Sequence, residues 1–160
     1  MSIYLTRNEP LISRRLFKHR PVISAMPIRF VCVVSRDDRP VFFVAATGVG
    51  EGEVPGLLTV VFASLDAIEE RTGATRRGAV YLGEVLLFEE LRVFALVTGT
   101  AAKIVLLGDD RDVDSAKEIA SAVHRRLVEA LQSPFQPPHA DIPSTRLRTQ
   151  VLHLLGRTGS

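Results

Sequence analysis

The order of short apolar runs and longer amphipathic segments is the feature that most constrains the fold of this chain. Two runs rich in β-branched and aromatic residues, 28–34 and 40–46, precede an amphipathic segment at 57–71. Three further apolar runs follow, at 80–88, 91–98 and 102–107. Two more amphipathic segments lie near the end of the chain. The predicted order is β-β-α-β-β-β-α-α, an α+β fold with a five-stranded antiparallel sheet and helices on its faces.

Turn residues separate these runs, and the runs themselves alternate only weakly. Residues 35–39 connect the first two strands, where aspartates favour a turn by bonding nearby backbone amides. Pro40 lacks an amide hydrogen and therefore belongs at the very start of its strand. Because the three later runs are almost wholly apolar, we expect both faces of the sheet to be covered, in part by another subunit.

The first helix is predicted from apolar residues that recur at helical spacing. They are Leu58, Val61, Phe62, Leu65 and Ile68. Gly73 follows as a helix cap, since glycine adopts the left-handed conformation that ends helices. Asp66 lies at the edge of this stripe. It is either a solvated boundary charge or a polar contact to a partner that binds this helix.

The helix predicted from residue 113 to residue 131 has the clearest amphipathic pattern. Its stripe consists of Val113, Ala116, Ile119, Ala120, Val123, Leu127 and Leu131. Pro134 ends this helix. Ser144 or Thr145 opens a last helix, for which the spacing predicts inward-facing Leu147, Val151, Leu154 and Leu155.

Residues 1–25 differ in charge from the rest of the chain. They carry five basic side chains against one acidic, a net charge of +4, whereas the remaining residues have a net charge of −2. We predict a disordered basic extension, with a targeting segment or an artefact upstream of Met26 as alternatives. The folded domain is then expected to span 26–157. Its charge gives no support for nucleic-acid binding.

The sequence predicts no catalytic, cofactor or metal site. Cys32 is the single cysteine and lies within a strand, which indicates a buried apolar role and a reducing compartment. The glycines at 48–56 lack the spacing and the lysine of a phosphate-binding loop. No histidine pairs with another ligand at metal spacing; the four are His19, His124, His139 and His153. We therefore do not expect an enzyme. Neither a secretory signal nor a membrane-spanning run is predicted.

An ordered set of short motifs carries a resemblance to a known family. The set comprises Asp38-Arg39-Pro40-Val41-Phe42, Ser64-Leu65-Asp66-Ala67-Ile68-Glu69-Glu70, Tyr81-Leu82-Gly83, Phe94 to Thr98, Lys103-Ile104-Val105, Ser133-Pro134-Phe135, Pro138 and Ile142-Pro143-Ser144. Over about 28–156 the chain resembles sedlin-type subunits of the TRAPP complex, in particular the subunit 2-like branch, which have the longin (profilin-like) fold. It departs from them at Gln136, where the family usually has tyrosine.

This resemblance implies a non-enzymatic subunit of the TRAPP vesicle-tethering complex, which promotes nucleotide exchange on a Rab-type GTPase in ER-to-Golgi and intra-Golgi transport. Such a subunit binds neighbouring small subunits and reaches Golgi membranes from the cytoplasm only through the complex. The expected partner-binding residues are Leu58, Val61, Phe62, Leu65, Asp66 and Phe135.

Other readings stay open at this stage. One is a longin-type adaptor of another trafficking complex, and a second is an α+β domain with a small-molecule pocket between helix and sheet. A longin SNARE would need heptads and an anchor after the domain, which the sequence does not supply. An enzyme has the least support.

Overall fold

The computed structural model describes residues 28–73, 78–109, 113–131 and 144–158. Its strands are β1 (Ile28–Val34), β2 (Pro40–Ala45), β3 (Val80–Phe88), β4 (Leu91–Val97) and β5 (Lys103–Gly108). Its helices are the short 3-10 turn η1 (Glu51–Glu53) and the α-helices α3 (Val54–Thr72), α4 (Val113–Leu131) and α5 (Ser144–Thr158). The predicted order of elements and the α+β class are confirmed.

The five strands form one antiparallel sheet in the order β2-β1-β5-β4-β3. β2 and β3 are therefore its edges, and the late strand β5 pairs with β1 in the middle. Pro40 begins an edge strand, where its missing amide hydrogen removes no ladder bond. In the turn before it, Asp38 has a φ of 62°, a left-handed conformation that aspartate tolerates better than most residues.

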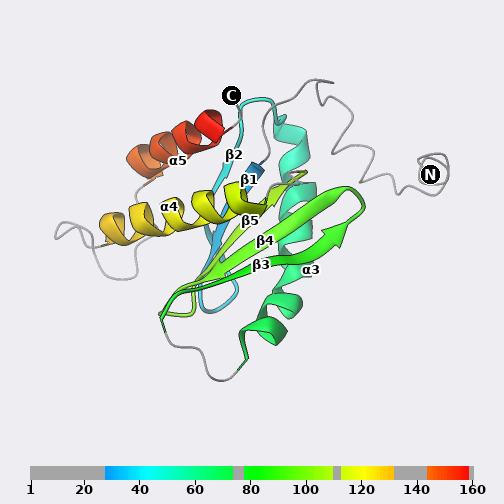
Figure 1. The fold of residues 1–160 in the computed structure, drawn as a ribbon. Coiled ribbons are helices and arrows are strands. Elements are labelled where there is room, and N and C mark those ends of the chain that lie inside the picture. Colours follow the sequence, from blue (N-terminus) through cyan, green and yellow to red (C-terminus); the bar gives the residue numbers. More distant parts are fainter. Residues whose placement is uncertain (1–27, 74–77, 110–112, 132–143, 159–160) are drawn as a thin grey trace.

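Helices cover the sheet on both sides, α3 on one face and α4 with α5 on the other (Figure 1). Every residue of β1 and β5 is buried, as the apolar runs predicted. Alternate side chains enter two separate cores: Ile104 and Leu106 join the one beneath α4 and α5, and Val105 and Leu107 join the one beneath α3. Sheet and helices thus make three layers around two cores.

The predicted stripes of α4 and α5 fit this arrangement where their side chains are described, which leaves Val113 and Leu131 outside the comparison. In α4 the buried residues include Ala116, Ile119, Ala120, Val123 and Leu127. In α5, Leu147, Val151 and Leu155 are buried, whereas Leu154 is only half-buried. The basic extension at 1–25, the residues Met26 and Pro27, and the corner at 133–135 lie outside the described residues.

Candidate functional site

The side of α3 that faces the sheet is defined by six buried residues: Leu57, Val60, Val61, Ser64, Leu65 and Ile68. The hydroxyl of Ser64 donates to the carbonyl oxygen of Val61 at 2.6 Å, so this small polar residue is satisfied where the helix approaches the strands. Val61 is 0% exposed and Leu65 is 8% exposed. Both side chains belong to the core beneath α3 and cannot contact a partner directly. The predicted set of partner-binding residues therefore loses Val61 and Leu65.

Beside this stripe and turning toward solvent, α3 carries Leu58, Phe62 and Asp66, which are spaced four residues apart and therefore share one side of the helix. Leu58 is half-buried, and Asp66 is exposed. The Phe62 side chain is 43% exposed, which is unusual for a large aromatic residue. Phe62 was expected in the same stripe as Val61 and Ile68, and the structure places it outside that stripe.

The edge strand β3 adds partly exposed apolar residues on the α3 side of the sheet. Its residues Leu82, Leu86 and Phe88 are half-buried and pack against the core beneath that helix. A guanidinium nitrogen of Arg71, at the end of α3, donates to the carbonyl oxygen of Leu82 at 3.4 Å and joins the helix to the strand edge. We call the partly exposed residues on this side of the sheet together the α3–β3 surface: Leu58, Phe62 and Asp66 of α3, and Leu82, Leu86 and Phe88 of β3. Arg71 reaches β3 from the side of the helix opposite Phe62, so the two groups of residues flank α3.

Strand β3 does not present a regular edge. Its register against β4 shifts between Tyr81 and Gly83 and again between Glu84 and Leu86, and Gly83 has a φ of 76°. Bulges of this kind interrupt the row of backbone groups that another strand needs for pairing. This surface is therefore better suited to contacts through side chains than to addition of a strand.

Two buried cations hold α3 on the sheet. At the beginning of the helix, a guanidinium nitrogen of Arg29 lies 3.8 Å from a carboxylate oxygen of Glu53, and both side chains are nearly buried. Toward its end, the Nζ of Lys103 lies 2.8 Å from Asp38 Oδ1 and 3.7 Å from Glu69 Oε1, although the Lys103 side chain is only 4% exposed. The beginning of α3 is thus tied to β1 through Arg29, and its end is tied to β5 through Lys103.

The Lys103 cluster joins residues from three of the sequence motifs. Asp38 comes from the turn after β1, Glu69 from α3 and Lys103 from the start of β5. These segments are distant in sequence, since 65 residues separate Asp38 from Lys103. Sequence reasoning did not identify this contact, and the only signal was a lysine that opens an otherwise apolar strand.

The described residues show no arrangement typical of catalysis or metal binding. Cys32 is buried in the core beneath α3, and this burial raises the pKa of its thiol from 9.0 to about 12. The thiol is therefore protonated and inert at neutral pH. Within the described part of the chain, no group of three or more His, Cys, Asp or Glu side chains is placed to hold a metal ion. None of the described helices is long and apolar enough to span a bilayer.

Of the six predicted partner-binding residues, the structure therefore brings three together on an accessible surface: Leu58, Phe62 and Asp66. It places Val61 and Leu65 in the core, and Phe135 lies outside the described residues. The sequence missed the contribution of β3, because its apolar residues gave no sign that this strand is an edge.

Comparison with known proteins supports the resemblance drawn from the motifs. Residues 33–157 match the model of the family described as Sedlin. The chain is also 23% identical to the Transport protein particle 20 kDa subunit of Schizosaccharomyces pombe over 133 residues, which are 80% of this chain and 96% of that protein. The family match runs from the first strand to the last helix and covers well over half of the sequence. This protein belongs to the sedlin family.

Proposed function

We propose that this chain is a subunit of the TRAPP vesicle-tethering complex and that it works by binding neighbouring small subunits, not by catalysis. Its membership of the sedlin family and the name of its fission-yeast relative support the assignment to a transport protein particle. In this proposal the chain serves a Rab-type GTPase only through the assembled complex. It is cytoplasmic and reaches ER–Golgi and Golgi membranes as part of that complex.

The observation that carries the proposal is the incomplete cover of the sheet on the α3 side. Five strands about 4.8 Å apart make a sheet about 19 Å wide, whereas a helix with its side chains is about 10 Å wide. Two helices are therefore needed to cover such a face, and the other face has two. Among the described residues only α3 lies on this side, and it packs mainly over β3 and β4. Leu58 and Phe62 of the helix and the half-buried Phe43 and Ala45 of β2 therefore stay partly open to solvent.

Within this surface the residues have separate tasks. Phe62 provides an exposed aromatic side chain of the kind that dominates the energetics of protein interfaces. Leu58 extends the apolar contact on the same side of the helix, and Asp66 adds a carboxylate beside it. A partner of matching chemistry presents an apolar patch with a basic side chain opposite Asp66. Val61 and Leu65 support binding only by holding α3 in place.

Replacing Phe62 tests the proposal, with Val128 as a matched control. Val128 is a partly exposed apolar residue on α4, at the opposite face, with 37% of its side chain accessible. Tagged full-length Phe62→Glu and Val128→Glu chains are purified from native cells, and the small TRAPP subunits recovered with them are quantified. We expect Phe62→Glu to lower recovery at least tenfold, as loss of a central aromatic contact does. Val128→Glu should recover amounts near those of the wild type.

A second variant, Asp66→Arg, separates a binding role from a structural one. It should weaken recovery while circular dichroism shows a folded domain, because the Asp66 side chain is exposed. An unfolded Asp66→Arg chain would make this residue structural and remove it from the surface. Recovery of no small subunit with the wild-type chain, which then behaves as a monomer, would reject the TRAPP assignment in favour of another adaptor or a ligand-binding domain.

A further inference from the structure

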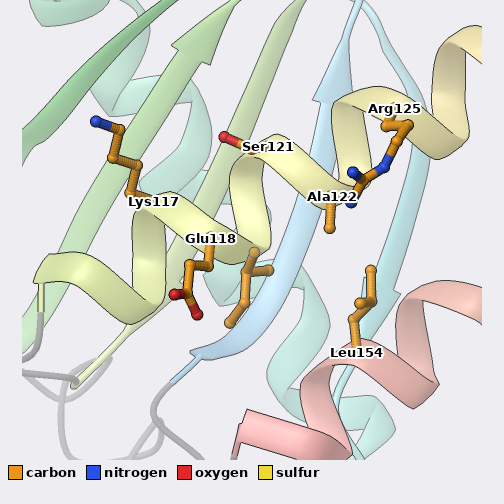
Figure 2. Close-up of a pocket in the computed structure, with 7 residues that line it drawn as sticks. Lys117, Glu118, Ser121, Ala122, Arg125 and Leu154 are labelled. Carbon is orange, nitrogen blue, oxygen red and sulfur yellow. The ribbon is translucent and has the colours of Figure 1, made fainter.

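A groove with a volume of about 530 Å³ lies on the opposite face of the molecule, between α4 and α5 (Figure 2). α4 contributes Lys117, Glu118, Ile119, Ser121, Ala122 and Arg125, and α5 contributes Leu154. In Figure 2, Leu154 points from α5 toward Ala122, and Glu118 lies on the α5 side of α4. A space of this volume accommodates several side chains of a bound segment.

The groove combines an apolar floor with charged walls. Ile119 and Ala122 are 1% and 7% exposed, and Leu154 is half-buried, so apolar atoms line the base. Lys117 and Arg125 are exposed and form no ion pair with any other described residue. Their positions on one helix, eight residues apart, place them about 12 Å from each other along its axis. In Figure 2, Arg125 points toward Ala122, whereas Lys117 points to the side of α4 away from α5, so the two cations stand at separate points along the rim formed by α4.

The charge of the whole layer agrees with that of the groove. α4 and α5 together carry six basic and three acidic side chains, a net charge of +3, and α5 has no acidic residue. η1 and α3, on the other face, carry one basic and five acidic side chains, a net charge of −4. Arg29 and Lys103 offset two of these charges through their pairs with Glu53 and Glu69, which leaves a net charge of −2, so the two faces still favour partners of opposite charge. An acidic partner complements the α4–α5 layer.

We propose that the α4–α5 groove is a second docking surface, which binds an acidic amphipathic peptide segment of a partner protein. Apolar side chains of the segment pack on Ala122 and Leu154, and its carboxylates pair with Lys117 and Arg125. A separation of about 12 Å corresponds to two acidic residues about four positions apart in an extended segment. Because the groove and the α3–β3 surface lie on opposite faces, both can be occupied at once.

The same residues disfavour an anionic membrane as the ligand. A bilayer surface is flat and cannot reach the apolar floor between two helices. Glu118 stands between the cations in sequence and lines the groove, so it repels phosphate groups. A peptide can satisfy this carboxylate with a backbone amide or a basic side chain of its own. The lining therefore fits a polypeptide with mixed chemistry better than a uniformly anionic surface.

Selection from a library of random 12-residue peptides, displayed on phage, tests this proposal with the full-length chain as bait. We expect the enriched peptides to combine acidic and apolar residues. The affinity of the best synthetic peptide is then measured by fluorescence anisotropy for three proteins: the wild type, Lys117→Glu/Arg125→Glu, and Arg36→Glu/Arg39→Glu. The last is the matched control, because it makes the same charge change at exposed residues of the turn after β1.

Binding should fall at least tenfold in the groove variant and less than twofold in the control. The peptide should bind Phe62→Glu as tightly as it binds the wild type, so the result does not depend on the TRAPP assignment. Equal weakening in both charge variants would show attraction by overall charge alone and overturn the proposal. The proposal is also overturned if the library yields no enriched peptide. Binding of the wild type to phosphatidylserine vesicles, with no binding to the peptides, would overturn it as well.

Discussion

The two faces of the sheet are covered in different ways. α3 covers one face alone and is held at both ends by the buried cations Arg29 and Lys103. α4 and α5 share the other face and pack on it through apolar residues, with the Arg148 guanidinium 5.7 Å from the centre of the Phe42 ring. One helix leaves an apolar, acidic surface, and two helices leave a basic groove. Two similar apolar interiors therefore support outer surfaces of different shape and charge.

The largest effect is expected from truncating one buried isoleucine in each core. Ile68 of α3 and Ile119 of α4 are 0% and 1% exposed. Replacing either with alanine removes buried methyl and methylene groups and should lower the free energy of unfolding by about 3 kcal/mol. Denaturant unfolding followed by circular dichroism measures both losses. Val128→Ala, at a partly exposed position of α4, should change the stability by less than about 0.5 kcal/mol.

These variants also test whether the two layers unfold together. If the sheet makes them one cooperative unit, each variant retains a single transition. A separate early transition in Ile119→Ala alone would show that α4 and α5 detach from the sheet while α3 stays bound. The two layers would then differ in stability more than their contacts indicate.

The second prediction concerns the ion pairs that distinguish the α3 side. Asp38→Asn keeps the turn, because asparagine also tolerates a positive φ, but it removes the nearer carboxylate of the buried Lys103 ammonium. We expect a loss of about 2 kcal/mol, since an incompletely paired buried charge is costly. Glu69→Gln should cost less than about 1 kcal/mol, because Glu69 is more distant and 69% exposed. Urea denaturation measures both changes.

Lys103→Met is the control for this interpretation. It removes the buried charge and leaves Asp38 and Glu69 in solvent, so it should be less damaging than Asp38→Asn. The opposite ranking of the two variants would mean that Lys103 acts through packing of its side chain and not through its charge.

The third prediction concerns alkaline pH and the core beneath α3. Burial raises the pKa of the Cys32 thiol in the folded state from 9.0 to about 12. Between these values the unfolded chain releases the thiol proton and the folded chain keeps it, so stability must fall as pH rises above about 9. The steepest contribution is about 1.4 kcal/mol per pH unit.

Comparison with Cys32→Ala isolates this contribution, because the variant lacks the titrating group. Its free energy of unfolding should decline less between pH 9 and pH 11, as measured in urea. Parallel curves for the two proteins would contradict the assigned pKa. Alkylation of the wild-type thiol at pH 8 provides a second check, and it should proceed only as fast as the domain opens.

The smallest effect is expected at the contact between α5 and β2. Arg148→Ala removes the cation above the Phe42 ring and should cost about 0.5 kcal/mol, since the guanidinium is exposed. Arg146→Ala is the control, because Arg146 is an exposed α5 residue that stacks on no ring of the described part of the chain. Thermal unfolding compares the two. An equal loss in both variants would show that only helix propensity or overall charge had changed.

The elements that the sequence predicted well are those with one strong local pattern. The stripe of α4 leaves a single apolar side, so Ala116, Ile119 and Val123 had to face a core. The strands at 28–34 and 103–108 are apolar except for Arg29 and Lys103, and their burial on both faces followed. In both cases the local pattern admits one arrangement only.

The orientation of α3 was predicted less well, because its local pattern admits more than one arrangement. Leu57, Leu58, Val60, Val61 and Phe62 surround much of the first turns of the helix, so apolar spacing alone cannot select the side that faces the sheet. The predicted stripe included Leu58 and Phe62. The structure buries Leu57, Val60 and Ser64 and leaves Phe62 exposed, which brings it onto the α3–β3 surface.

The sequence by itself thus determined the order of the elements, the cores of α4 and α5, and membership of the sedlin family, because these depend on local periodicity and on ordered motifs. The tertiary structure decided which side of α3 is exposed, that β3 is an edge strand, and that Lys103 is buried against Asp38 and Glu69. Each of these depends on contacts between segments far apart in the chain. Side chains acquire such neighbours only when the sheet and its helices are packed together.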